Sequence, residues 1–147
     1  MKRIRDEFGL TLVSIFAFAF LLNYFWESCH AVFLYARHDF NAEKYVRMVS
    51  YASAVDGFII IGMYLFVSGL WRDLFWLHRM DRKQQYAAGL TGLVVAAMIE
   101  YSKVFVLKAW SYTPLMPTVF GIGLSPLIQI SVTGLLAFWL TRRLLFR

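Results

Sequence analysis

The chain has 147 residues, of which 60% are hydrophobic and 18% aromatic, and its formal net charge is +6 at pH 7. Soluble domains are usually about 45–50% apolar, so this composition indicates a membrane protein and argues against a soluble enzyme. The single cysteine, Cys29, excludes an internal disulfide and any metal site built from several cysteines.

Four long apolar segments, separated by short charged loops, occupy most of the chain. They cover residues 8–35, 46–70, 86–107 and 118–141. Each reaches the ~20 residues that an α-helix needs to cross a hydrocarbon core of about 30 Å. Because the loops are short, successive helices are expected to be antiparallel neighbours. The sequence therefore predicts an all-α fold, with residues 1–147 forming one transmembrane domain, a four-helix up-down bundle.

The basic residues are distributed unevenly among the loops. The side that holds both ends of the chain carries Lys2, Arg3, Arg5, Arg72, Arg79, Arg82, Lys83, Arg142, Arg143 and Arg147. The opposite side carries only Arg37, Lys44, Arg47 and Lys108. Since basic loops stay on the cytoplasmic side, we expect a multi-pass protein of a bacterial inner membrane with both termini cytoplasmic. The positive charge is then explained by topology and lipid headgroups, and no nucleic-acid partner is expected.

Two loops carry signals of their own. The loop 71–85 mixes aromatic residues, Trp76 among them, with arginines, a pattern that favours an interfacial aromatic belt. The start of the last helix has two alternatives. It begins near Thr118 and kinks at Pro126, or Ser125 is the N-cap and Pro126 the first helical residue. In the second case residues 117–124 are non-helical, which is tolerated at membrane depth only inside protein or along a cavity.

Each apolar segment also carries polar side chains that lipid should reject. An ionisable group at the bilayer centre costs at least about 2.5–3.5 kcal/mol, so it usually faces a protein interior. These residues are Asn23, Glu27 and His30 in the first segment, Asp56 in the second, Glu100 and Lys103 in the third, and Gln129 in the fourth. At 1.5 Å per residue, the three carboxyl groups lie at a similar depth of roughly 11–15 Å below the external ends of their helices.

Helical spacing places several of these groups on shared faces. Asn23, Glu27 and His30 are spaced i, i+4, i+7, and Glu100 and Lys103 are spaced i, i+3. We therefore expect an intramembrane polar pocket that is open toward the external side. Crowded carboxylates in a medium of low dielectric constant cannot all be ionised, so at least one is expected to keep its proton and to be available as an acid.

Purely structural roles for the same residues remain open. Glu100 and Lys103 could form an internal ion pair, and Asp56 could pair with His30 or Lys103. Asn23 and Gln129 could each make an interhelical hydrogen bond worth about 1 kcal/mol. These alternatives need no ligand and predict closed pairs in place of a pocket.

A dry pocket with a proton donor suits acid–base chemistry on, or binding of, an isoprenoid or lipid-like molecule. A protonated carboxyl group can start a carbocation, which aromatic faces stabilise. The candidate catalytic residues are Glu27, Asp56, Glu100 and His30. The candidate substrate-binding residues are Asn23, Trp26, Tyr101, Lys103, Trp110, Tyr112 and Gln129. The expected partners are a lipid or isoprenoid ligand and membrane lipids, with a homodimer or larger membrane complex left open, and no cofactor is expected.

Three resemblances bear on this hypothesis. Asn23-Tyr24-Phe25-Trp26-Glu27, with Tyr35 eight residues on, resembles the N-x-x-W-E stretch of integral-membrane terpene cyclases. That likeness implies a proton-donating role for Glu27, and Glu100 takes the place of the family's second acid only by analogy. It covers about a dozen residues of a family whose members are longer, with about seven helices. Carboxylates and a tryptophan in a small bundle are also similar to the sterol-isomerase and sigma-2-receptor superfamily.

The third resemblance spans most of the chain. It joins Trp26-Glu27, Asp56 and Glu100 to the patterns W-x-Y-x-x-x-M-P from Trp110 and G-x-G-x-S-P-x-x-Q from Gly121. This layout resembles a group of small four-helix bacterial inner-membrane proteins. The likeness implies a fold and a location but no reaction.

Two other functions are alternatives. The first is a non-catalytic accessory subunit of a membrane complex, which should tolerate loss of the carboxyl groups. The second is an intramembrane metal or cation site. Glu27-x-x-His30 has the i, i+3 spacing of carboxylate di-metal bundles, and Asp56 and Glu100 could add oxygen ligands. Such bundles normally carry two of these motifs, whereas this chain has one, and Lys103 would repel a cation.

Overall fold

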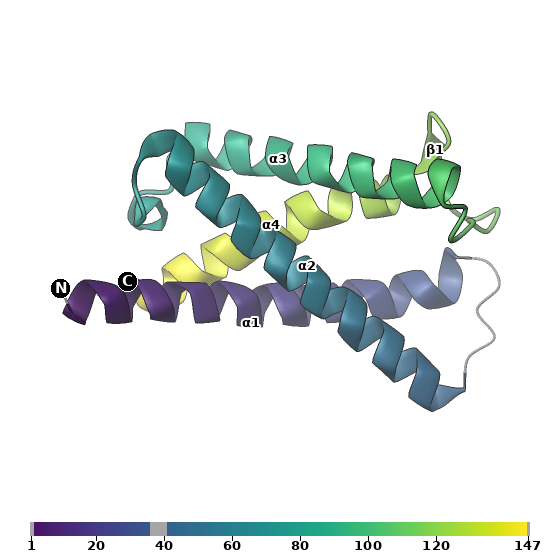
Figure 1. Cartoon of the computed structure of the whole chain (residues 1–147), viewed down its shortest axis with the longest axis horizontal. Helices are drawn as coiled ribbons and strands as arrows, with labels where there is room; N and C mark the ends of the chain where they lie inside the picture. The colour runs from purple at the N-terminus through teal and green to yellow at the C-terminus, as the bar shows by residue number, and fades with distance from the viewer. Residues whose placement is uncertain (1, 36–40, 147) are drawn as a thin grey trace.

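The computed structural model describes residues 2–35 and 41–146, and it is almost entirely helical (Figure 1). The elements are α1 (Lys2–Phe33), α2 (Ala42–Trp71), the 3-10 helix η1 (Trp76–His78), α3 (Arg82–Tyr101), the π-helical turn η2 (Ser102–Val106), β1 (Thr118–Val119), β2 (Ile122–Gly123) and α4 (Leu124–Leu145). The four long helices are all long and apolar enough to cross a membrane. The expected all-α fold is confirmed. Arg37 and Arg147, two of the basic residues in the charge argument, lie outside the described residues.

Successive helices run antiparallel, but the bundle is splayed. In Figure 1, α1 and α3 lie along opposite edges while α2 crosses in front of them and α4 behind. Contacts are most extensive between α1 and α2 and between α3 and α4, and they are sparse between α2 and α3. We call the end where α1 begins and α4 finishes the terminal end, and the opposite end the distal end. The helices α2 and α3 diverge toward the distal end.

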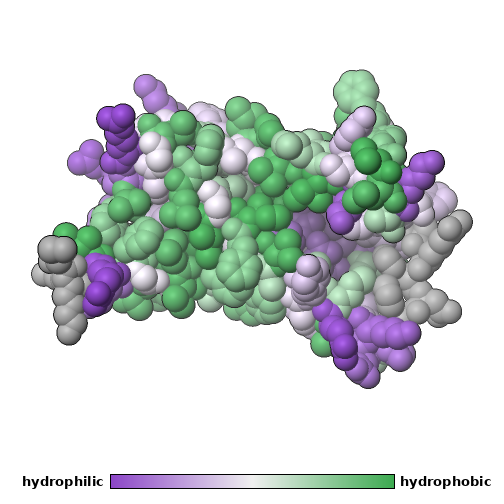
Figure 2. Space-filling model, in the orientation of Figure 1, coloured by the Kyte–Doolittle hydropathy of each residue, from purple (hydrophilic) through white to green (hydrophobic). Residues whose placement is uncertain are grey.

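The outer surface of the bundle is apolar around its middle (Figure 2). In Figure 2 hydrophobic side chains cover the central part of the face, and hydrophilic groups gather at its two ends. Large apolar side chains such as Phe25, Tyr51 and Met98 are more than 60% exposed. A soluble monomer rarely exposes such continuous apolar surface.

Of the two alternatives for the last helix, a start near residue 118 is wrong, and the non-helical stretch of the second alternative is present up to residue 123. Residues 118–123 form a short antiparallel ribbon in which Thr118 pairs with Gly123. Gly121 takes a φ of +78° at its turn, which glycine adopts without strain. The N-cap of α4 is Gly123 in place of Ser125, and Pro126 lies in the first turn, where its missing N–H breaks no helical hydrogen bond.

The loop after α2 folds back into the bundle at the terminal end. Trp76 and Leu77 are completely buried. The Trp76 ring stacks on Tyr64 at 5.7 Å between centroids and meets Phe138 edge-on at 5.5 Å. Its indole N–H donates to the Tyr64 carbonyl oxygen at 3.3 Å. The expected interfacial belt is therefore wrong for Trp76, because this ring fills space between α2 and α4.

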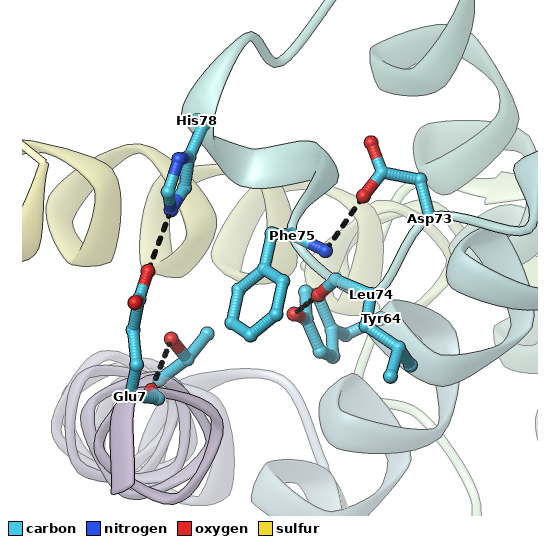
Figure 3. Close-up of polar contacts among 7 residues, drawn as sticks. Glu7, Tyr64, Asp73, Leu74, Phe75 and His78 are labelled. Carbon is cyan, nitrogen blue, oxygen red and sulfur yellow. Dashed lines mark hydrogen bonds and ion pairs between the residues drawn. The ribbon is translucent and has the colours of Figure 1, made fainter. Parts of the chain in front are cut away.

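Polar contacts tie the same loop to its surroundings (Figure 3). The Tyr64 hydroxyl donates to the Leu74 carbonyl oxygen, and the Phe75 N–H donates to the Asp73 carboxylate at 2.8 Å. His78 lies 3.0 Å from the Glu7 carboxylate of α1. The loop thus holds α1 and α2 together at the terminal end.

Helices α3 and α4 approach most tightly where a glycine is required. A Cβ atom on Gly92 would lie 2.9 Å from the backbone N and Cα of Ser131, whereas one on Gly89 would meet only a Leu135 methyl at 3.4 Å. We expect Gly92→Ala to lower the free energy of unfolding by about 1–3 kcal/mol through overpacking. Gly89→Ala is the matched control and should be neutral or stabilising by up to about 1 kcal/mol, since alanine favours helix. Denaturation of both variants in detergent tests this, and equal effects would contradict it.

Candidate functional site

A cavity of about 340 Å³ lies among the four helices, in the half of the bundle nearer the distal end. Its apolar walls come mainly from one face of α2 and one face of α3. These wall residues are Met48, Ala52, Val55 and Ile59 on α2 and Ala96 and Ile99 on α3. Its polar and aromatic lining consists of Glu27, Tyr35, Tyr51, Asp56, Glu100, Lys103, Trp110 and Gln129. An apolar cavity with a few convergent polar groups is the usual form of a small-molecule site.

One amide joins three helices at the base of this cavity. The Gln129 side-chain nitrogen on α4 donates toward Glu27 Oε1 of α1 at 2.7 Å and Asp56 Oδ2 of α2 at 3.1 Å. It also faces Asn23 Oδ1 of α1 at 3.0 Å, an oxygen that accepts from the Thr133 hydroxyl at 3.1 Å as well. The shared nitrogen places the Glu27 and Asp56 carboxyl groups side by side.

Neutral donors, and no cation, contact the oxygens of this junction in the described residues. The two hydrogens of the amide nitrogen can go to Glu27 and Asp56, since Asn23 Oδ1 also has the Thr133 hydroxyl as a donor. Among residues 2–35 and 41–146, neither Glu27 nor Asp56 forms an ion pair. The alternative in which Asp56 pairs with His30 or Lys103 is not what the structure shows, because its carboxyl group contacts Gln129. The two carboxyl groups meet without a cation between them.

Glu100 is held differently, by three aromatic donors. The Tyr35 hydroxyl donates to its Oε1 at 3.2 Å, the Trp110 indole N–H to its Oε2 at 3.4 Å, and the Tyr112 hydroxyl also donates to Oε2. Burial and the neighbouring Glu100 carboxylate raise the pKa of Tyr35 and of Tyr112 above the ordinary tyrosine value. Both phenols therefore keep their protons at neutral pH and act as donors. The alternative of an ion pair between Glu100 and Lys103 is not what the structure shows.

These aromatic donors belong to a covering of the distal end. Residues 107–117, named the strap here, dock on the end of α1. The Thr113 N–H donates to the Leu34 carbonyl oxygen at 2.9 Å, the Thr113 hydroxyl donates to the Phe33 carbonyl oxygen at 3.0 Å, and Tyr35 pairs with Tyr112 as an isolated β-bridge. With Trp110 in its wall, the cavity is covered by the strap at this end.

No family model, curated protein or solved structure matches this chain.

The cavity opens sideways, between α2 and α3. Figure 2 shows the hollow between the first half of α2 and the last turns of α3, with hydrophilic side chains at its base. The α2 residues at its rim are open to the outside, with Tyr51 72% and Val55 39% exposed. From the sequence we expect a pocket that opens toward the external side. In the structure the strap covers the distal end, and the opening lies between α2 and α3.

Lys103 lies at the rim of this opening, within η2. Its ammonium nitrogen is 5.7 Å from the centre of the Trp110 ring, a cation–π contact. In the described part of the chain it forms no ion pair with a carboxylate. It is the one described cation that lines the cavity.

His30 and Trp26 lie outside the cavity lining. The Trp26 indole N–H donates to His30 Nε2 at 3.1 Å, and the Ser125 hydroxyl is hydrogen-bonded to the same nitrogen. An imidazolium could not accept the Trp26 bond, so this geometry needs the neutral ring with its proton on Nδ1. His30 fastens α1 to α4, although its spacing places it on the Glu27 face.

Three further candidates are also absent from the cavity lining, namely Asn23, Tyr101 and Tyr112, whose hydroxyl is bound to Glu100. Asn23 is buried beneath it, in the Gln129 junction. Tyr101 is 56% exposed, and its ring stacks on Phe105. It points outward because adjacent helical positions are about 100° apart and the preceding residue, Glu100, faces inward. A substrate-binding role for Tyr101 therefore has no support in the structure.

The arrangement also bears on the metal alternative of Glu27, His30, Asp56 and Glu100. Across residues 2–35 and 41–146, no three or more histidine, cysteine, aspartate or glutamate side chains are grouped so that they could hold a metal ion. The four side chains are divided among the Gln129 junction, the Glu100 cluster and the His30 contacts. The structure gives this alternative no support.

Proposed function

We propose that the chain spans a bacterial-type inner membrane four times, with both termini in the cytoplasm. Four helices of sufficient length and apolarity support this proposal, as does the apolar middle of the surface. The described basic residues of the terminal end, among them Arg72, Arg79 and Arg82, outnumber those of the distal end, as the positive-inside rule requires.

We further propose that the cavity carries out acid–base chemistry on an isoprenoid or lipid-like molecule. The observation that carries this function is the meeting of Glu27 and Asp56 at one Gln129 nitrogen, without a cation, in the wall of an apolar cavity. In this proposal the pair holds one proton, because two ionised carboxylates this close in an apolar wall would repel each other. Two carboxyl groups that share a proton provide an acid and a base in one place.

The reaction class follows from what the residues supply. Glu27 donates a proton to the ligand, as the likeness to membrane terpene cyclases implies, and Asp56 takes a proton back from a neighbouring atom. Such a double transfer leaves the ligand's composition and oxidation state unchanged, so it describes an isomerisation or a cyclisation. Tyr51 and Trp110 in the lining offer aromatic faces to a cationic intermediate.

Exchange of solvent hydrogen into a ligand tests this function. We expect the purified protein, incubated in deuterium oxide with isoprenoid lipids, to introduce deuterium that mass spectrometry detects. Glu27→Gln and Asp56→Asn should each reduce the rate at least about 100-fold, the usual contribution of general acid–base catalysis. Both substitutions keep the side-chain size, so circular dichroism should show an unchanged fold.

Glu43→Gln is the matched control, because Glu43 is an exposed carboxyl group of α2 paired with Arg47. It should leave the exchange rate unchanged. Wild-type protein that exchanges no faster than Glu27→Gln would contradict the enzymatic function and favour a non-catalytic subunit of a membrane complex.

A further inference from the structure

The cavity lining has one described cation, Lys103, and no described carboxylate forms an ion pair with it. Lys103 is half-buried at the rim, and its ammonium group contacts the Trp110 ring but no carboxylate in the described residues. The nearest carboxyl group along the helix, Glu100, is engaged by Tyr35, Trp110 and Tyr112. An anion bound beside this ammonium group could form a charge-assisted hydrogen bond with it.

The path to Lys103 leads through the side of the bundle. The strap covers the distal end through Thr113 and the Tyr35–Tyr112 bridge, while the gap between α2 and α3 is bordered by exposed apolar side chains such as Val55. In a chain that spans the membrane, as proposed above, this gap faces lipid. A molecule dissolved in the bilayer reaches the cavity without crossing water.

We infer that the ligand is an anionic lipid, entering from the bilayer between α2 and α3 with its charged head at Lys103 and its chain toward Glu27 and Asp56. This inference rests on the proposed function and names the ligand class of the same cavity. The positions agree with a lipid of the distal leaflet, since Lys103 is nearest the distal end and the lining reaches Ala96 deeper on the same helix. Seven residues of helix span about 10 Å.

The size of the cavity limits how much of the lipid it holds. A volume of about 340 Å³ is at the lower end of the ~300–1,000 Å³ of small-molecule sites. The cavity therefore takes the head and the first part of one chain, and the remainder stays in the gap among the bilayer lipids. The acid pair then meets the ligand a short way along its chain.

Binding of simple amphiphiles tests the inference. Calorimetric titration of the protein in dodecyl maltoside micelles should show dodecyl phosphate binding at least tenfold more tightly than dodecanol. Lys103→Gln should abolish that preference. Lys108→Gln, which removes an exposed lysine of the strap that does not line the cavity, should retain it.

The route is tested at the rim of the gap. Val55→Trp should weaken dodecyl phosphate binding at least tenfold by narrowing the opening. Phe58→Trp, at an exposed α2 position outside the lining, should leave binding unchanged. Inorganic phosphate that binds as tightly as dodecyl phosphate would overturn the inference, because it would reveal an anion site open to water.

The outcomes separate this inference from the proposed function. Equal affinities for dodecyl phosphate and dodecanol, or an unchanged preference in Lys103→Gln, overturn the anionic ligand even if deuterium exchange still depends on Glu27 and Asp56. Lys103-dependent binding without any such exchange supports the anionic ligand and overturns the catalytic function.

Discussion

Replacement of Gln129 by leucine is expected to lower the free energy of unfolding by about 2–4 kcal/mol, because it leaves buried acceptors without their donor. The amide nitrogen reaches Glu27, Asp56 and Asn23 on two other helices. Leucine has a similar volume, so the loss reflects hydrogen bonding more than packing. Denaturation with sodium dodecyl sulfate, followed by circular dichroism, measures the change.

Thr133→Val provides the comparison for this result. Thr133 lies one turn beyond Gln129 on α4 and donates to the same Asn23 oxygen at 3.1 Å. Valine keeps its shape and removes one hydroxyl, so a loss of about 1 kcal/mol is expected. If Gln129→Leu were no more harmful than Thr133→Val, the Gln129 amide would not be the main link among α1, α2 and α4.

The second large effect is expected at the terminal end. Trp76→Ala should lower the free energy of unfolding by about 3–5 kcal/mol, the usual cost of removing a buried large aromatic ring. The ring is completely buried between Tyr64 and Phe138, and the neighbouring helices cannot easily close the space it leaves. Thermal unfolding in detergent measures the loss.

Trp71→Ala is the control for this substitution. Trp71 ends α2 at the same end of the bundle but is 40% exposed. Its replacement should change the free energy of unfolding by less than about 1 kcal/mol, as is usual for surface sites. Equal losses for the two tryptophans would contradict a buried, space-filling role for Trp76.

The helices could be predicted because apolar length is a local property of the sequence. Twenty or so apolar residues leave few structures other than a spanning helix, and the constant helical rise put Glu27, Asp56 and Glu100 at similar depth. All three line one cavity. Their distribution between two separate clusters depends on the rotation of each helix about its axis. The apolar pattern does not define that rotation, because lipid and protein interior are equally apolar.

The partners of Glu100 could not be chosen from the sequence. The chain has eight tyrosines and five tryptophans, and only docking of the strap selects Tyr35, Tyr112 and Trp110 as donors. The sequence pattern alone therefore does not identify Tyr35 as a site residue. Its one signal is its position eight residues beyond Glu27, near the same helical face.

The interface pattern around Trp76 was ambiguous for a similar reason. Aromatic residues among arginines are typical of a membrane interface, but the same composition serves a loop that folds inward. Distance along the chain does not show that Tyr64 and Phe138 leave room for an indole ring between them. Burial of Trp76 is determined by tertiary packing and not by the local sequence.

The Gln129 junction also has a consequence for biosynthesis. Glu27 and its amide donor are separated by 102 positions in the sequence. At roughly 5–20 residues per second, the first helix waits on the order of 5–20 s after its own synthesis before Gln129 exists. Throughout that interval Asn23 and Glu27 lack their final partner, so the nascent chain depends on water, lipid headgroups or the insertion machinery to shelter them. The last helix made completes the polar contacts of the first.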